Sequence, residues 1–344
     1  MPLPPSPRGP LSDTVLTALR AQPGALSCDA DAAACDDTAD PLGDDDLHLA
    51  LYCCYELHYR GFEGVDPRWE WDPALLALRA RLEDIFEVGL SEALAGWTPP
   101  RADAATMDLA LREIAHADDG PSIARYLETR GTVAEFREFL IHRSAYQLKE
   151  ADPHSWAIPR LWGPPKAALV EVQADEYGNG DPERVHAHLF GRAMDALALD
   201  PGYGAYLNVL PGVTLATVNL MSLFGLHRRH RGKLVGHLAL FEMTSSIPNR
   251  RYAGGLRRLG LRSADATTFF DEHVTADAVH ENIAAVDLAG GLAQCEPQLI
   301  NDILLGAQAL IELDRRWASK LLAAWDQNQI ALHAAEPEPE PASV

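Results

Sequence analysis

Cysteine is scarce in this 344-residue chain and is not arranged as a framework. The five cysteines (Cys28, Cys35, Cys53, Cys54 and Cys295) are odd in number and include no CxxC pair. This pattern disfavours both a disulfide scaffold and a thiolate metal site. We therefore expect reduced thiols with no chemical role, so that any metal site must use other side chains.

Basic residues and long apolar runs are also in short supply. The chain has 29 Lys and Arg residues against 50 Asp and Glu residues, a formal charge of −21. This balance argues against nucleic acid or an anionic membrane as the main partner. The opening MPLPPSPRGP lacks the apolar core of a secretory signal, and no stretch approaches the ~20 apolar residues of a membrane span. A cytoplasmic protein is the default expectation.

Strand patterns and a glycine-rich phosphate loop are missing too, and the remaining signal is helical. Apolar residues recur at three- and four-residue spacing in the segments 72–97, 131–151, 166–177, 181–200, 230–245, 267–288 and 297–325. With 47% hydrophobic residues, the stretch 46–330 is predicted to form a single all-α domain with one core. The Pro-, Ala- and Asp-rich residues 1–45 and the Glu-Pro repeats of 331–344 are expected to be disordered tails.

One amphipathic stretch concentrates metal-binding side chains. FFDEHVTADAVHE (269–281) places His273, Asp277 and His280 at offsets of four and three. A helix advances about 100° per residue, so the three side chains fall within roughly 60° of one another on one face. Upstream, Glu242 lies in the apolar segment LALFEM, where a carboxylate is costly unless it is protonated or paired with a positive partner. A metal ion is such a partner.

A third helical region contributes Glu176, Glu183 and His186. In helical bundles, inward carboxylates and imidazoles from several helices build di-iron and di-manganese centres. Mixed imidazole and carboxylate ligation without thiolate suits iron or manganese. The sequence therefore predicts a dinuclear site with seven ligands: Glu176, Glu183, His186, Glu242, His273, Asp277 and His280.

The three pieces, in this order and spacing, resemble the haem-oxygenase-like diiron oxidases and oxygenases, a family often described as iron-containing redox enzymes. The resemblance extends over roughly residues 135–325. It implies a haem-oxygenase-like seven-helix bundle, here with additional N-terminal helices. It also implies two iron ions (Fe²⁺/Fe³⁺), no haem, and dioxygen as co-substrate. Known chemistries of the family include N-oxygenation of amines and oxidative carbon–carbon cleavage of fatty or amino acids.

The leading hypothesis is thus a non-haem diiron oxidoreductase acting on a small metabolite that bears an amine or a carboxylate. We expect one iron to be held by Glu176, His186, Glu242 and His280, and the other by His273, Asp277 and a bridging Glu183. Whether the enzyme uses an external electron donor, and whether it forms a homodimer, are both open.

The segment GNGDP (178–182) departs from a continuous helix. Pro182 after Asp181 indicates a fresh helix start with an N-cap, so Glu176 and His186 could lie on two helices. Glu183 would then fall in a first helical turn, where it could simply stabilise the helix N-terminus.

Other polar residues have plainer interpretations. Glu135 and His142 also share a helix face, but an exposed amphipathic helix explains them better. Glu150 lies in KEADPH, a cluster typical of loops and caps, and could supply a carboxylate near the metals. Arg250 or Arg251 could hold a substrate carboxylate in a bidentate pair, with a solvated helix face as the alternative.

Two other functions remain open. A two-metal hydrolase using manganese, iron or zinc would activate water without needing oxygen. A non-catalytic helical interaction protein would bind no stoichiometric metal, and alanine at His273 and His280 would leave its fold and effect untouched.

Overall fold

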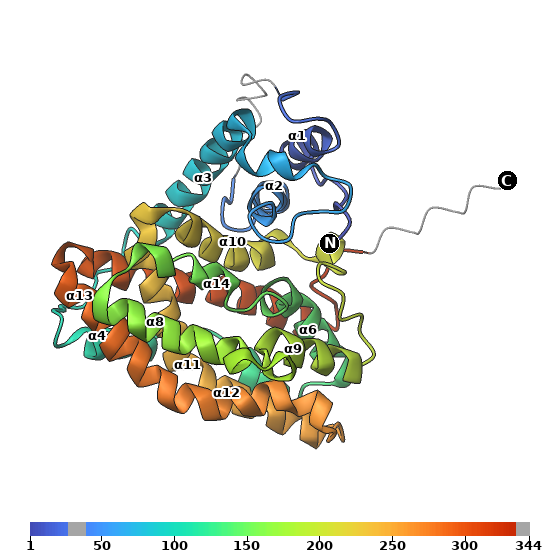
Figure 1. Cartoon of the computed structure of the whole chain (residues 1–344). Coiled ribbons are helices and arrows are strands. Elements are labelled where there is room, and N and C mark those ends of the chain that lie inside the picture. Colours follow the sequence, from blue (N-terminus) through green and yellow to red (C-terminus); the bar gives the residue numbers. More distant parts are fainter. Residues whose placement is uncertain (27–38, 335–344) are drawn as a thin grey trace.

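The computed structural model describes residues 1–26 and 39–334, without the side chains of 277–279, and the regular elements in these ranges are all helical (Figure 1). This confirms the all-α prediction. The α-helices are α1 (Pro10–Leu19), α2 (Asp45–Glu56), α3 (Pro73–Ala93), α4 (Met107–Ala117), α5 (Ile123–Thr129), α6 (Val133–Gln147), α7 (Asp152–Ser155), α8 (Gly163–Glu176), α9 (His186–Ala196), α10 (Gly212–Leu226), α11 (Arg231–Arg258), α12 (Ala264–Asn282), α13 (Gly291–Cys295) and α14 (Ile300–Asp326). A π-helical segment, Ile283–Gly290, continues α12.

Local sequence signals explain several helix starts. Asp72 caps α3 by accepting hydrogen bonds from the backbone N–H groups of Ala74 and Leu75, and Pro73 follows it. Thr132 and Glu135 form a reciprocal capping box at the start of α6. Glu135 is therefore occupied as a cap, and α6, which the turn with Glu150 follows, begins at a fixed place.

The long helices α11 and α14 cross at a pair of glycines. A Cβ atom at Gly236 would collide with the backbone oxygen of Ile303, and one at Gly306 would collide with the backbone oxygen of Lys233. Only glycine permits so close an approach of two backbones. Because α11 also packs along α12, it is the central element that sets where the polar residues of both helices meet.

The buried apolar residues form two clusters rather than the single core that was expected. One joins the N-terminal helices to α10, α11 and α14. The other gathers aromatic residues of α6, α9, α11, α12 and α14, among them Phe139, Phe190, Tyr252, Phe269 and Trp317. Figure 1 shows α1, α2 and α3 together at one end, with α8, α9, α11 and α12 at the other. The second cluster lies with the helices that carry the predicted ligands.

The N-terminal segment corrects one prediction. Residues 10–19, expected to belong to a disordered tail, form α1, which packs against α2. Leu11, Val15, Leu16 and Leu19 are buried, because their spacing places them on one helix face. Composition averaged over 45 residues concealed this short amphipathic stretch. Residues 27–38 and 335–344 lie outside the described ranges, and the second of these ranges is most of the predicted C-terminal tail.

Two further helix boundaries differ from expectation. The segment predicted to end near 245 continues as α11 through Pro248 to Arg258. The helix expected from residue 181 begins instead at His186, after short 3₁₀ turns. Within the described residues, no helix combines the length and hydrophobicity needed to cross a membrane.

Candidate metal centre

Six buried acidic and imidazole side chains from five segments converge in the helical region. Glu150 lies in the turn after α6, Glu176 ends α8 and His186 begins α9. Glu242 lies in the middle of α11, and His273 and His280 lie on α12. All six are at most 6% exposed, which is rare for such groups unless they are paired or coordinate a metal.

The ligand atoms fall into two sets that share Glu176. Glu150, Glu176, His186 and His273 form the first set, and Glu176, Glu242 and His280 form the second. In each set the candidate atoms lie within 4.8 Å of one another. This grouping differs from the expected partition, because His186 lies with His273 rather than with His280. Glu150 occupies the place that was expected for Glu183.

A strained turn delivers Glu150 to the cluster. The next residue, Ala151, has φ +74°, a backbone conformation that residues with a Cβ seldom adopt. Ala151 is buried, and its carbonyl accepts a hydrogen bond of 2.7 Å from Nε2 of Gln173 on α8. Helix α8 therefore holds the turn in place, and the same helix ends in Glu176.

The GNGDP segment brings Glu176 and His186 together. Gly178 has φ +67°, and a Cβ atom there would lie 2.8 Å from the backbone of Arg184, so the chain doubles back tightly. Asn179 also adopts a left-handed conformation, with φ +53°. The two ligands thus lie on separate helices, as the sequence indicated, yet Glu176 Oε2 and His186 Nδ1 are 3.0 Å apart.

The distances suit ions held between these groups. Two ligand atoms about 2.1 Å from one metal and at right angles lie about 3.0 Å apart. The observed separations are 3.0 Å for Glu176–His186, 3.4 Å for Glu242–His280 and 3.5 Å for Glu150–His273. Glu176 Oε2, His186 Nδ1 and His280 Nδ1 make no hydrogen bond of acceptable geometry, although they are buried. The donor set, nitrogen and oxygen without sulfur, fits iron or manganese.

Charge within the cluster is only partly balanced. Burial by itself raises the pKa of Glu176, but the contact with His186 and the charges of His186, His273 and His280 together outweigh burial and bring that pKa to about 2. The same contact, against the opposing effect of burial, raises the pKa of His186. Burial raises the pKa of both Glu150 and Glu242. The cluster therefore favours positive charge at its centre, which a metal cation would supply.

Two of the imidazoles are oriented by partners outside the cluster. His273 Nδ1 donates to the carbonyl of Phe269 at 2.8 Å, so in the neutral ring the lone pair is on Nε2, which faces Glu150. His280 Nε2 lies 3.2 Å from Asp175 Oδ2, which leaves Nδ1 facing Glu242. Ligating histidines commonly have such a partner on the other ring nitrogen, since it fixes the tautomer and the ring orientation.

The remaining predicted residues lie elsewhere. The Glu183 side chain is 72% exposed and lies 3.8 Å from His188, outside the cluster, because the 3₁₀ turn Pro182–Arg184 precedes α9. Arg250 is exposed, and Arg251 lies 3.6 Å from Glu128. Neither arginine lines the cavity described below. The side chain of Asp277 lies outside the described residues.

The other pair of residues weighed from the sequence, Glu135 and His142, does not come together either. Glu135 accepts hydrogen bonds from Thr132 and Tyr126, whereas His142 Nδ1 lies 2.7 Å from Thr214 Oγ1 on α10. His142 is 1% exposed, so its helix is not the solvated one that was expected. These two residues make separate structural contacts.

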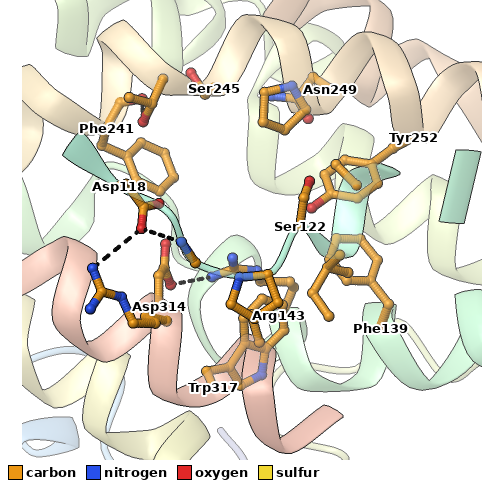
Figure 2. A pocket seen from close by; sticks show the side chains of 18 of the residues that line it. Asp118, Ser122, Phe139, Arg143, Phe241, Ser245, Asn249, Tyr252, Asp314 and Trp317 are labelled. Carbon is orange, nitrogen blue, oxygen red and sulfur yellow. Dashed lines mark hydrogen bonds and ion pairs between the residues drawn. The ribbon is translucent and has the colours of Figure 1, made fainter. Parts of the chain in front are cut away.

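A cavity of about 320 Å³ adjoins the cluster (Figure 2). Phe241 and Ser245 of α11 line both this cavity and the small space around Glu150, Glu176, Glu242 and His273. Because the two spaces share Phe241 and Ser245, a ligand in the cavity would lie beside the cluster. Pro248 also lines the cavity and lacks an N–H, so it cannot donate a hydrogen bond to the carbonyl one turn earlier in α11.

Comparison with known proteins agrees with this geometry. Residues 137–315 match the family described as iron-containing redox enzyme, which has the haem-oxygenase-like fold. The match covers over half of the chain, and the chain belongs to this family. The protein is therefore an iron-containing redox enzyme, with a haem-oxygenase-like domain and added N-terminal helices.

A characterised relative is the nitrosourea synthase of Streptomyces achromogenes subsp. streptozoticus. It is 25% identical to this chain over 173 residues, which is 50% of this chain and 36% of that protein. The chain thus spans about a third of the relative's length.

Sequence reasoning missed several residues that the structure places around the site. Asp175 was overlooked beside Glu176, although two consecutive acids at a helix end are a usable signal. Arg143 and Asp314, which line the cavity, lie 171 positions apart and show no motif. Only the packing of α6 on α14 brings them together.

Proposed function

We propose that this protein is a dinuclear non-haem iron oxygenase in which Glu176 is shared between two metal positions. The observation that carries this proposal is the pair of buried ligand sets that have Glu176 in common. Glu150, His186 and His273 would complete one position, and Glu242 and His280 the other. Asp277, about one helical turn from both His273 and His280, is proposed as a further ligand of the pair.

When bound, a pair of ferrous ions supplies the electrons that activate dioxygen. The chain's contribution is orientation and exclusion of water. Asp175 and the carbonyl of Phe269 hold His280 and His273 in their ligating tautomers. Tyr146 and Phe241, with ring centroids 5.7 Å apart, cover the cluster from α6 and α11. These apolar rings keep bulk water from the reacting centre.

Nitrogen is the atom that we propose to be oxidised. The relative is named for making a nitrosourea, a product that contains an oxidised nitrogen. In an N-oxygenation, one oxygen atom of O₂ enters the N–O bond and the other leaves as water, with two electrons and two protons from an external reductant. Oxidative carbon–carbon cleavage is the second candidate reaction.

The test is an anaerobic titration with ferrous iron, followed by admission of oxygen. We expect about two irons per chain and a visible absorption that develops only with oxygen. Glu176→Ala should lose both, whereas Glu183→Ala, in an exposed residue, should retain both. Failure to take up stoichiometric iron, or turnover of a substrate without oxygen consumption, would contradict the proposal. The second result would point to a two-metal hydrolase.

A further inference from the structure

The cavity beside the cluster carries charge of both signs in equal amounts. Its charged lining residues are two acids and two arginines, namely Asp118, Arg143, Asp314 and Arg315. The rest of the wall is aromatic, aliphatic or uncharged polar. Cavities that bind small molecules have this character: they are mostly apolar, with a few polar groups that fix the orientation of the ligand. The polar groups therefore indicate the ligand's charge.

Arg143 and Asp314 face each other across α6 and α14. Arg143 Nη1 lies 3.5 Å from Asp314 Oδ1, which is longer than a close ion pair. The guanidinium of Arg143 also lies 4.0 Å from the centre of the Trp317 ring. Figure 2 shows Arg143, Asp314 and Trp317 on one side of the cavity and Ser245 and Asn249 of α11 on the opposite side. The Asp314 side chain is 34% exposed, and its partial burial raises its pKa, so a cation placed beside it would stabilise its charged form.

We propose that this cavity binds a zwitterion of the amino-acid type, with Arg143 holding the carboxylate and Asp314 holding the ammonium group. This inference rests on the proposed function for its relation to the metals, but the binding itself needs no metal. The second pair, Arg315 with Asp118 at 3.6 Å, adds one charge of each sign to the cavity lining.

The other ligand classes fit less well. A plain carboxylate, such as a fatty acid, would pair with Arg143 but place its anion beside Asp314. A plain amine would pair with Asp314 but place its cation beside Arg143. Each would leave one partly buried charge without a partner or facing a like charge, which weakens binding. A zwitterion satisfies both side chains at once. A volume of about 320 Å³ is also near the lower limit for ligand cavities, which favours a small molecule.

The geometry further indicates which end of the ligand reacts. Arg143 and Gln147 are four residues apart on α6, about 6 Å of helix rise. With its amide nitrogen turned toward the cluster, Gln147 donates to Glu150 Oε1 at 2.5 Å. A zwitterionic head held by Arg143 would thus lie on the wall of α6 one helical turn before Gln147, the residue that reaches Glu150. The group that is oxidised would be at the end of the ligand's side chain, not at its α-carbon.

Binding can be measured on the metal-free protein by calorimetry, independently of iron chemistry. The probes are the standard amino acids, together with two truncated series: leucine with 4-methylpentanoate and 3-methylbutylamine, and lysine with 6-aminohexanoate and pentane-1,5-diamine. We expect at least one amino acid to bind about tenfold or more tightly than the analogues that lack its α-ammonium or α-carboxylate group. Equal binding of the truncated analogues, or no amino acid binding at millimolar concentration, would overturn the proposal.

Variants assign the two contacts. Asp314→Asn protein should no longer bind amino acids more tightly than the analogues that lack the α-ammonium group, but should still prefer them to the analogues that lack the α-carboxylate. Arg143→Gln protein should lose only the preference over the analogues that lack the α-carboxylate. Arg250→Gln, in an exposed arginine outside the cavity, is the matched control. Asp314→Glu keeps the charge and should keep the preference, which separates recognition from a folding defect. If both cavity variants retain the full preference in folded protein, the assignment is wrong.

The two proposals fail separately. If amino acids bind as expected but iron is not taken up, the dinuclear centre is wrong and the zwitterion site stands. If oxygen is consumed with a fatty acid or a plain amine while no amino acid binds, the centre stands and the zwitterion site is wrong.

Discussion

Two buried carboxylates, Glu56 and Glu176, have opposite surroundings. Glu56 accepts hydrogen bonds from Lys149 Nζ at 3.0 Å, from the Tyr203 hydroxyl at 2.6 Å and from the backbone N–H of Arg60 at 3.3 Å. Glu176 Oε2 faces imidazole nitrogen but makes no hydrogen bond of acceptable geometry. One carboxylate is saturated with donors, and the other has lone pairs to share with an ion.

The difference separates hydrogen-bonded structural carboxylates from candidate metal ligands in this molecule. Buried polar groups are normally hydrogen-bonded, and an exception needs an explanation. Glu138 is hydrogen-bonded in the same way as Glu56, since it accepts hydrogen bonds from Trp325 Nε1 at 2.8 Å and from the Ala331 N–H at 2.5 Å. Both kinds of polar group occur in consecutive residues: Lys149 donates to Glu56, and Glu150 belongs to the candidate metal cluster. Removing a residue of each kind should therefore have different consequences.

The largest effect is expected for Glu176→Gln, which removes the charge shared by both ligand sets. Iron content should fall from about two per chain toward none, and oxygen consumption should fall by more than the ~10–100-fold typical of groups outside the ligands. Metal analysis after desalting and an oxygen electrode measure the two effects. If Glu176→Gln protein retained two irons, Glu176 would not be a metal ligand, and its lack of hydrogen bonds would need another explanation.

Breaking the saturated network should cost stability instead. Glu56→Gln leaves the Lys149 ammonium buried without a counter-charge, and we expect the free energy of unfolding to fall by about 3–5 kcal/mol. Urea unfolding measures this change. The iron content of the folded protein should be unchanged. The double variant Glu56→Leu/Lys149→Met should recover much of the loss, because it leaves no unpaired charge.

A smaller effect concerns buried His48, which lies within hydrogen-bond distance of the Pro41 carbonyl and of Asn219. Burial lowers its pKa to about 4 in the folded protein, below the value of about 6.5 in an unfolded chain. Between pH 6.5 and 4 the unfolded state binds more protons, so the free energy of unfolding falls as pH falls. One histidine contributes up to about 1.4 kcal/mol per pH unit in this window and nothing above it.

His48→Gln should flatten this acid limb of the stability curve relative to the unaltered protein. Urea unfolding at several pH values between 4 and 7 provides the measurement. Curves of equal slope for both proteins would mean that His48 is not the neutral buried group described above.

The smallest effect is expected for Glu183→Ala. Because this side chain is 72% exposed and outside both ligand sets, stability should change by no more than about 0.5 kcal/mol and iron content not at all. Loss of one iron in this variant would restore Glu183 as a ligand and displace Glu150 from the first set.

Sequence periodicity was sufficient for the helices that carry the candidate ligands and for most of those ligands, but not for α1 or α10. His273 and His280 share one helix face because residues seven apart lie two turns apart on the same side. Glu242 was identifiable because a carboxylate among apolar residues needs a partner. Glu150 was named as a loop or cap residue that could supply a carboxylate near the metals, but nothing in KEADPH reveals the strained turn at Ala151 that directs it inward.

The chain alone determined an all-α protein with imidazoles and carboxylates on facing helices, because helix periodicity and the cost of burying charge are local properties. Tertiary structure decided that His186 lies with His273, that Glu150 rather than Glu183 enters the cluster, and that Arg143 meets Asp314. These contacts depend on how α6, α8, α11, α12 and α14 cross, and the crossings are set by close approaches such as Gly236 against Ile303 that no single segment specifies.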